Sequence, residues 1–241
     1  RTKEVIKATK IQGVGVGEES YVSQILGSTF QQYNFYENNL YILDKDFISP
    51  FSFQAKAYYF FTLIDSVEID GAPCYQIKVD PKNPMDLVFS GMVWIEANSY
   101  ALKRLSLEIG NKANLNFIEK LKIQQEFLEV EPTYWLPNKT RVLIDIAELT
   151  NNTVGMIGLY YNSTKNIKIN RVHELPFYED NISVVENSFT KSDVYWDTAR
   201  HEKISQEDKR IYQMVDSLKN QPLIKSYVDI VEIAIEGHIP K

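Results

Sequence analysis

The chain has 241 residues, of which 44% are apolar and 24% are charged, and its formal net charge is −6. This length is enough for one large or two small domains with a sizeable buried core. The acidic balance and the absence of any Lys/Arg cluster argue against binding to nucleic acid or to an anionic lipid surface.

The first fifty residues predict a strand, a helix and an irregular segment. The strand is expected over Val5–Ile11, and Glu19–Tyr33 repeats apolar residues at the spacing of a helix. Residues 34–50 are rich in aromatic side chains, and a Ser-Pro break ends them. We expect this segment to be irregular.

From about residue 56 to residue 146 the apolar residues alternate with polar ones, as in strands with one dry face. Asp70-Gly71 is a strong hairpin signal between two such runs. Strands are predicted around residues 59–69, 75–79, 87–95, 105–109, 121–127 and 142–146, with a further pair around 156–161 and 165–169. Their spacing predicts an antiparallel meander, and a sheet of this size curls. Its dry face must be covered by helices, by closure or by a ligand.

The last seventy residues predict a different organisation. Residues 170–203 are polar and irregular, and a helix is expected over 205–219, with Ser205 as its N-cap. A strand is expected over Tyr227–Ile235. We therefore divide the chain into a sheet domain, residues 1–170, and an extended C-terminal segment, residues 171–241.

No arrangement of reactive side chains predicts catalysis. The three histidines lie far apart and lack metal-ligand spacing, and Cys74 has no histidine near it in the sequence. Neighbouring carboxylates such as Asp44 and Asp46 are typical of solvated loops rather than of a glycosidase site. We expect no catalytic residue, metal site or cofactor, and we expect that the chain is not an enzyme.

The apolar side of the sheet is the candidate ligand-binding surface. An aromatic cluster between residues 33 and 61 could line a groove there, although packing between the first helix and the sheet is the favoured interpretation. The predicted ligand-binding residues, all on the apolar side of the strands, are Phe61, Leu63, Ile77, Phe89, Val93, Leu107, Ile123, Phe127 and Ile144.

Several motifs between Asp70 and Pro137 occur in a characteristic order. They are Asp70-Gly71, Asp86-Leu87-Val88-Phe89-Ser90-Gly91, Trp94-Ile95, Tyr100-Ala101-Leu102-Lys103-Arg104, Gln124-Gln125-Glu126-Phe127 and Tyr134-Trp135-Leu136-Pro137. This order resembles an uncharacterised family of large outer-membrane proteins of the Bacteroidota. Tyr195-Trp196 and Arg200-His201 are similar to the family's linker before the barrel. The resemblance implies an N-terminal carboxypeptidase-regulatory-like domain, a central domain and a C-terminal membrane β-barrel. We expect this chain to be the central domain alone, at the periplasmic face of the outer membrane, with no transmembrane segment.

The central domain also looks like the lipoprotein-carrier fold of LolA and LolB. That resemblance implies an α+β fold, mainly antiparallel β, in which helices cover the concave face of a curved half-barrel and an apolar cavity holds acyl chains. Resemblance of fold alone is weak support for function.

Three functions remain open. The first is a non-enzymatic binding or assembly module whose partner is a lipid, a lipoprotein or another polypeptide. The second is a structural spacer or docking domain, whose exposed sheet edges could pair with a partner strand. The third is a hydrolase without a recognisable motif, which would need clustered ionisable groups in a pocket.

Overall fold

The computed structural model describes residues 4–8, 33–42, 45–113, 118–146, 156–170, 172–178, 182–188 and 190–200, together with Gln206, Arg210 and Gln213. Its internal contacts form two compact units. One unit is Thr29–Asn170, and the other joins Arg1–Ser28 to Arg171–Lys241.

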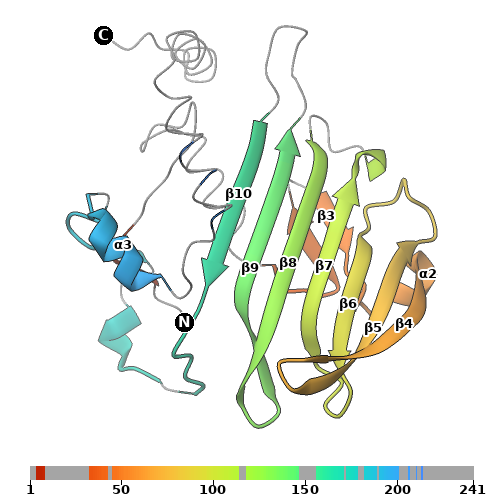
Figure 1. Cartoon of the computed structure of the whole chain (residues 1–241), viewed down its shortest axis with the longest axis horizontal. Helices are drawn as coiled ribbons and strands as arrows, with labels where there is room; N and C mark the ends of the chain where they lie inside the picture. The colour runs from red at the N-terminus through yellow and green to blue at the C-terminus, as the bar shows by residue number, and fades with distance from the viewer. Residues whose placement is uncertain are drawn as a thin grey trace, which may run out of the picture. The chain divides into compact units, whose positions relative to one another are not determined.

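A seven-stranded antiparallel sheet forms the larger unit (Figure 1). Its strands are β4 (Tyr59–Ile69), β5 (Ala72–Pro81), β6 (Ser90–Glu96), β7 (Leu102–Gly110), β8 (Ile118–Glu131), β9 (Tyr134–Ile146) and β10 (Met156–Ser163). Each strand pairs with its neighbour in the sequence, so the order is β10-β9-β8-β7-β6-β5-β4 and the sheet is not closed. The predicted antiparallel meander is confirmed. The expected strand around residues 165–169 is wrong, because residues 164–170 contain no strand.

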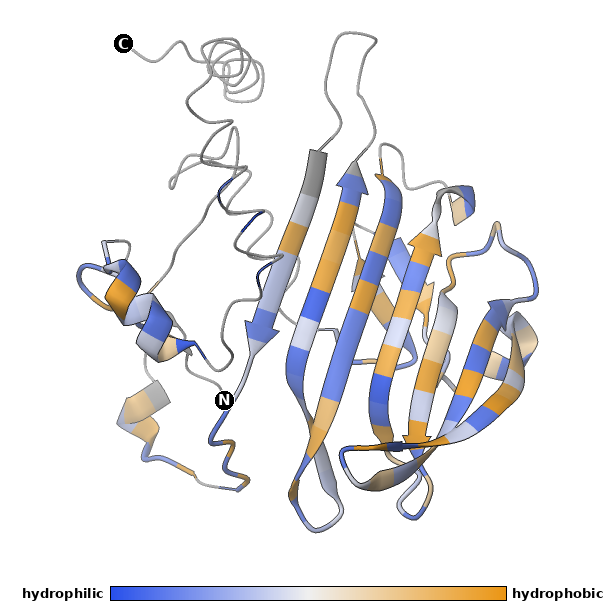
Figure 2. Cartoon of the chain, viewed as in Figure 1, coloured by the Kyte–Doolittle hydropathy of each residue, from blue (hydrophilic) through white to orange (hydrophobic). Residues whose placement is uncertain are grey.

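Alternating burial gives the sheet a covered face and an open face. In β8 the buried side chains of Leu121, Ile123 and Phe127 alternate with partly exposed Lys122 and Glu126. Figure 2 shows the same alternation as hydrophobic and hydrophilic bands along β8 and β9. Successive side chains of a strand point to opposite faces, so this pattern places the apolar core on one side only.

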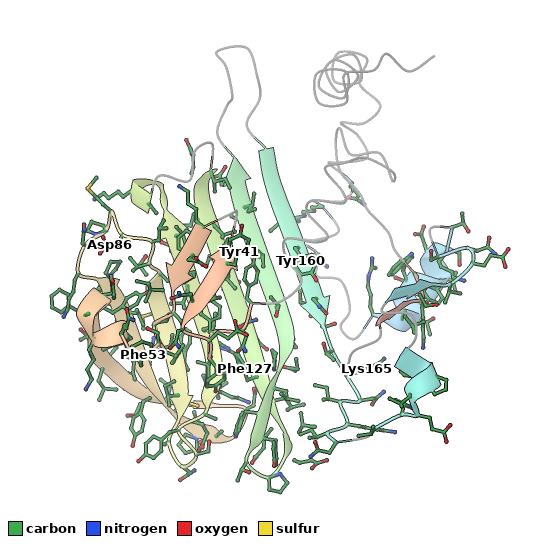
Figure 3. The ribbon with its side chains drawn as sticks, turned by 180° about the vertical axis from the view of Figure 1, so that it is seen from behind. Tyr41, Phe53, Asp86, Phe127, Tyr160 and Lys165 are labelled. Carbon is green, nitrogen blue, oxygen red and sulfur yellow. The ribbon has the colours of Figure 1, made fainter. Side chains whose placement is uncertain are left out.

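A β-hairpin lies against the covered face (Figure 3). It consists of β2 (Asn39–Ile42) and β3 (Lys45–Ile48), which pair antiparallel, and it contributes the buried side chains of Leu40 and Phe47. The expectation that residues 34–50 are irregular is therefore wrong for these two strands. The predicted helix over Glu19–Tyr33 lies almost entirely outside the described residues, so the cover described here is a hairpin.

Aromatic packing and buried hydrogen bonds hold the cover in place. The ring of Phe89, which precedes β6, packs against Phe35 and Phe47 with centroid separations of 5.2 and 5.6 Å. The buried Tyr59 hydroxyl donates to the Ile48 carbonyl and accepts from the Phe89 N–H at 3.1 Å. Buried backbone groups need hydrogen-bond partners, and the Tyr59 hydroxyl supplies one to the Ile48 carbonyl and one to the Phe89 N–H. It therefore links β4 to β3 and to the segment before β6.

The tip of the β4–β5 hairpin folds over the open face. Asp70 and Gly71 have φ of 52° and 78°, as the predicted Asp-Gly turn requires. The Asp70 carboxylate lies 3.2 Å from Lys103 Nζ, and the N–H of Ala97 donates to the carbonyl of Pro73 at 2.9 Å. These contacts attach the tip to β7 and to the β6–β7 turn, and the tip crosses in front of the lower end of the sheet in Figure 1.

Both units also contain short elements. In the larger unit they are α2 (Ala55–Tyr58) and the 3-10 turn η1 (Asn111–Ala113). In the smaller unit β1 (Glu4–Ile6) pairs in parallel with β11 (Ile182–Val184), and η2 (Leu175–Tyr178) and α3 (Asp193–Ala199) lie in the segment expected to be irregular. The N-cap of α3 is Ser192, whose hydroxyl accepts the Tyr195 N–H.

The C-terminal predictions fall largely outside the described residues. The three residues described in the expected helix 205–219, Gln206, Arg210 and Gln213, are helical. The rest of that helix and the strand over Tyr227–Ile235 are not described.

Candidate functional site

The nine predicted ligand-binding residues divide into a buried set and an exposed set. Phe61 and Leu63 on β4 are 44% and 61% exposed, and Ile77 on β5 is partly exposed. The other six are at most 4% exposed, and they are Phe89, Val93, Leu107, Ile123, Phe127 and Ile144. The candidate surface is therefore mostly core, with an exposed margin on the edge strand.

Packing leaves no space for an acyl chain beside the six buried residues. Their accessible surface is close to zero, so nothing as large as a water molecule touches them. Phe47 of the hairpin and Phe35 from the segment before it pack against Phe89 on this face. An acyl chain could reach this surface only by displacing part of the cover.

Strand β4 exposes apolar side chains on both of its faces. Phe60 and Ile64 are 59% and 52% exposed, in addition to Phe61 and Leu63. Among the described residues β4 pairs only with β5, so the backbone along its other side forms a sheet edge. A long apolar edge strand is rare in isolated proteins, because it invites pairing with another chain.

A bulge divides β4 into two unequal halves. The register against β5 shifts between Leu63 and Asp65, which leaves Ile64 as the extra residue. Beyond the bulge the strand carries Asp65 and Glu68, whose charges discourage edge pairing. The residues before the bulge, 60–63, have no such protection, so they are the candidate interface, with Ile64 at its end.

The displaced pKa values in the described residues are caused by burial or by hydrogen bonds within turns. Burial raises the pKa of the Tyr33 and Tyr59 phenols and of the Cys74 thiol. Hydrogen bonds from Ser99, above all from its hydroxyl, and from the Asn98 N–H lower the pKa of Glu96 to about 2. Within the described part of the chain, no group of three His, Cys, Asp or Glu residues could hold a metal ion.

The open face of β6–β9 carries a second feature, a polar hollow of about 230 Å³. Its lining includes Trp94, Arg104, Glu126, Lys139 and Arg141. The alternation in the sequence places Arg104, Glu126 and Arg141 on the polar side of their strands, and none of the lining residues is among the predicted ligand-binding residues. The available signal was that cations recur at outward positions of β7 and β9, on either side of β8, and their proximity becomes visible only once the strand register is known.

The protein belongs to the mainly antiparallel β class: its sheet is open, and the helices among the described residues are short. Residues 1–167 match a family of unknown function, DUF5686. The match covers more than half of the chain, so the chain belongs to this family. No curated protein and no solved structure matches it. Among the described residues, no helix is long and apolar enough to cross a membrane.

Proposed function

We propose that this chain is a non-enzymatic binding module that takes up an extended segment of a partner polypeptide along strand β4. The supporting observation is the edge strand itself, in which four apolar side chains within residues 60–64 are between 44% and 61% exposed. The absence of catalytic motifs from the sequence agrees with a binding role.

The chemistry of the edge favours a polypeptide partner over a lipid. An added strand can hydrogen-bond to the outward N–H and C=O groups of β4, and an acyl chain cannot. The partner's alternate side chains would meet Phe61 and Leu63 on one face and Phe60 on the other. Full burial of each large apolar side chain would contribute about 1.5–3 kcal/mol before the cost of ordering the partner.

The site of action follows from the family resemblance. We place the module at the periplasmic face of the outer membrane, beside a barrel in the same polypeptide. The motif order from Asp70 to Pro137 supports this location, and the carrier-like half-barrel is part of the same proposal. In that setting the partner would be another periplasmic polypeptide or a lipoprotein held by its protein part.

A peptide selection tests this proposal directly. The purified protein is used to select from a phage-displayed library of random ten-residue peptides. We expect the selected peptides to be extended and apolar at alternate positions. Their binding, measured as synthetic peptides by calorimetry, should fall at least about tenfold in the double variant Phe61→Lys/Leu63→Lys, which corresponds to about 1.4 kcal/mol.

The opposite edge strand provides a matched control. Leu159 on β10 is 62% exposed and Leu63 on β4 is 61% exposed, so Leu159→Lys and the single variant Leu63→Lys add one positive charge each to opposite edges. Peptides that bind the control and the β4 variant equally, or a selection that yields none, would exclude β4 as the interface. Sedimentation of the protein alone reports whether β4 instead pairs with a second copy. Pelleting with phosphatidylethanolamine vesicles that is lost with the β4 variant would favour a lipid partner.

A further inference from the structure

The polar hollow lies on the open face, where two rows of side chains cross adjacent strands. In the first row Trp94, Arg104, Glu126 and Lys139 are register neighbours from β6 to β9. In the second row Ser106, Gln124 and Arg141 follow one another on β7, β8 and β9. The rows adjoin along each strand, so the cations of three different residues converge on one space.

Positive charge exceeds negative charge in this space. Arg104, Lys139 and Arg141 contribute three positive charges, and Glu126 contributes the single negative charge, which leaves +2. This local excess contrasts with the formal charge of −6 for the whole chain. The field within the hollow therefore favours an anion.

One carboxylate is shared between two of these cations. Glu126 Oε1 lies 3.6 Å from Arg104 Nη2, and Oε2 lies 3.3 Å from Lys139 Nζ. These separations exceed the 2.7–2.9 Å of strong charge-assisted hydrogen bonds. The Arg104 Nε–H is buried and has no hydrogen-bond partner, so the protein does not satisfy all the donors of this guanidinium.

The arrangement also supplies neutral contacts. Gln124 Nε2 donates to Ser106 Oγ at 3.3 Å on the floor of the hollow, and Trp94 adds an aromatic wall. The volume lies below the roughly 300–1,000 Å³ of sites for drug-sized ligands. The space therefore suits one small unit with a charged group and a hydroxylated body.

We propose that the hollow is a binding site for a small organic anion, namely a sugar unit that carries a carboxylate or a phosphate. The guanidinium groups of Arg104 and Arg141 bind the anionic group, and Lys139 adds charge. Gln124 and Ser106 bind hydroxyls, and Trp94 contacts the sugar ring. Glu126 carries the single negative charge in the hollow and competes with the ligand for Arg104 and Lys139. This site is on the open face, so it does not depend on the function proposed for β4.

Three related sugars test the chemistry of the ligand. Galacturonate, galactose 6-phosphate and uncharged galactose are titrated into the whole protein by calorimetry at low ionic strength. We expect binding of at least one anionic sugar and none of galactose. A preference between the two anions distinguishes a carboxylate ligand from a phosphate ligand. If neither anionic sugar binds, or if galactose binds equally well, the proposal is wrong.

Charge variants locate the site. Arg104→Gln and Arg141→Gln should each weaken binding at least about tenfold, as expected for the loss of a charge-assisted hydrogen bond. Glu126→Gln should strengthen it, because the competing carboxylate is removed. The matched control is Lys122→Gln, which removes a cation from the same face of β8 outside the hollow. An equal loss in this control, or weaker binding by Glu126→Gln, would overturn the assignment. Unchanged thermal unfolding of the Arg141 variant separates binding from folding.

Discussion

The carboxylate of Glu96 organises the turn between β6 and β7. It accepts the N–H and side-chain amide of Asn98 at 3.0 and 2.8 Å, and the N–H and hydroxyl of Ser99, both at 2.6 Å. Tyr100 follows with φ of 57°, a left-handed conformation that is uncommon for residues other than glycine. Four donors directed at one carboxylate stabilise its charged form, so the pKa of Glu96 falls to about 2.

This lowered pKa makes the stability of the turn depend on pH. The pKa of Glu96 is about 2 in the folded chain, compared with an ordinary value of 4.5, so its contribution is complete above pH 4.5 and disappears as the pH falls towards 2. We expect Glu96→Gln to unfold at lower urea concentration than the natural sequence at pH 7. The difference should narrow between pH 4.5 and pH 2. A difference that stays constant across this range would show that the charge of Glu96 is not the cause.

At the scale of single strands, Gly91 sets how closely β6 approaches β7. Its φ is +144°, and a Cβ at this position would lie 2.2 Å from the carbonyl oxygen of Ser106. Gly71 in the β4–β5 turn also has positive φ, +78°, but a Cβ there would meet nothing within 4 Å. The two glycines therefore separate the effect of backbone conformation from the effect of a steric clash.

Alanine at these two positions should destabilise the sheet to different degrees. Gly71→Ala should lower the free energy of unfolding by about 1–2 kcal/mol, the cost of a left-handed conformation. Gly91→Ala should lower it by more than about 3 kcal/mol, because β6 must also move away from β7. Urea denaturation followed by circular dichroism measures both. Equal losses of unfolding free energy in the two variants would mean that β6 moves away from β7 at no cost in free energy.

The strands of the meander could be predicted because local pattern and tertiary environment agree. In β7 and β8, Leu105, Leu107 and Ile123 alternate with polar residues, and every second position is buried. The Asp70-Gly71 turn has a geometry that its residue types favour. Each strand of the meander pairs with the strands next to it in the sequence, so the alternation of apolar and polar residues is enough to predict its place in the sheet.

The covering hairpin could not be predicted in the same way. Strands β2 and β3 have four residues each, and their burial depends on contacts with strands that come much later in the sequence. The exposure of the β4 side chains could not be predicted either, because it also depends on contacts between segments far apart in the sequence. Alternation marks Phe61 and Leu63 as facing the dry side, but it does not show where the cover ends. The polar hollow was equally hidden, because its cations come from strands β7 and β9, which are not adjacent.

At the scale of the whole molecule, the described core of the sheet lies within the larger unit. The sheet, the hairpin and Phe89 lie within Thr29–Asn170. We expect the fragment of residues 29–170 to fold alone, with a strand-rich circular dichroism spectrum and a single cooperative thermal transition. A fragment that unfolds gradually, or that folds only when residues 171–241 are added, would contradict this independence.

The pairing of β1 with β11 determines how the chain would carry a mechanical load. Residues 4–6 lie beside residues 182–184 in parallel, and the whole large unit is inserted between them. Tension applied to the polypeptide on both sides of these strands would pull them in opposite directions along their length. The hydrogen bonds between β1 and β11 would then be loaded together, in shear. The seven-stranded sheet would carry no force until this short strand pair separated.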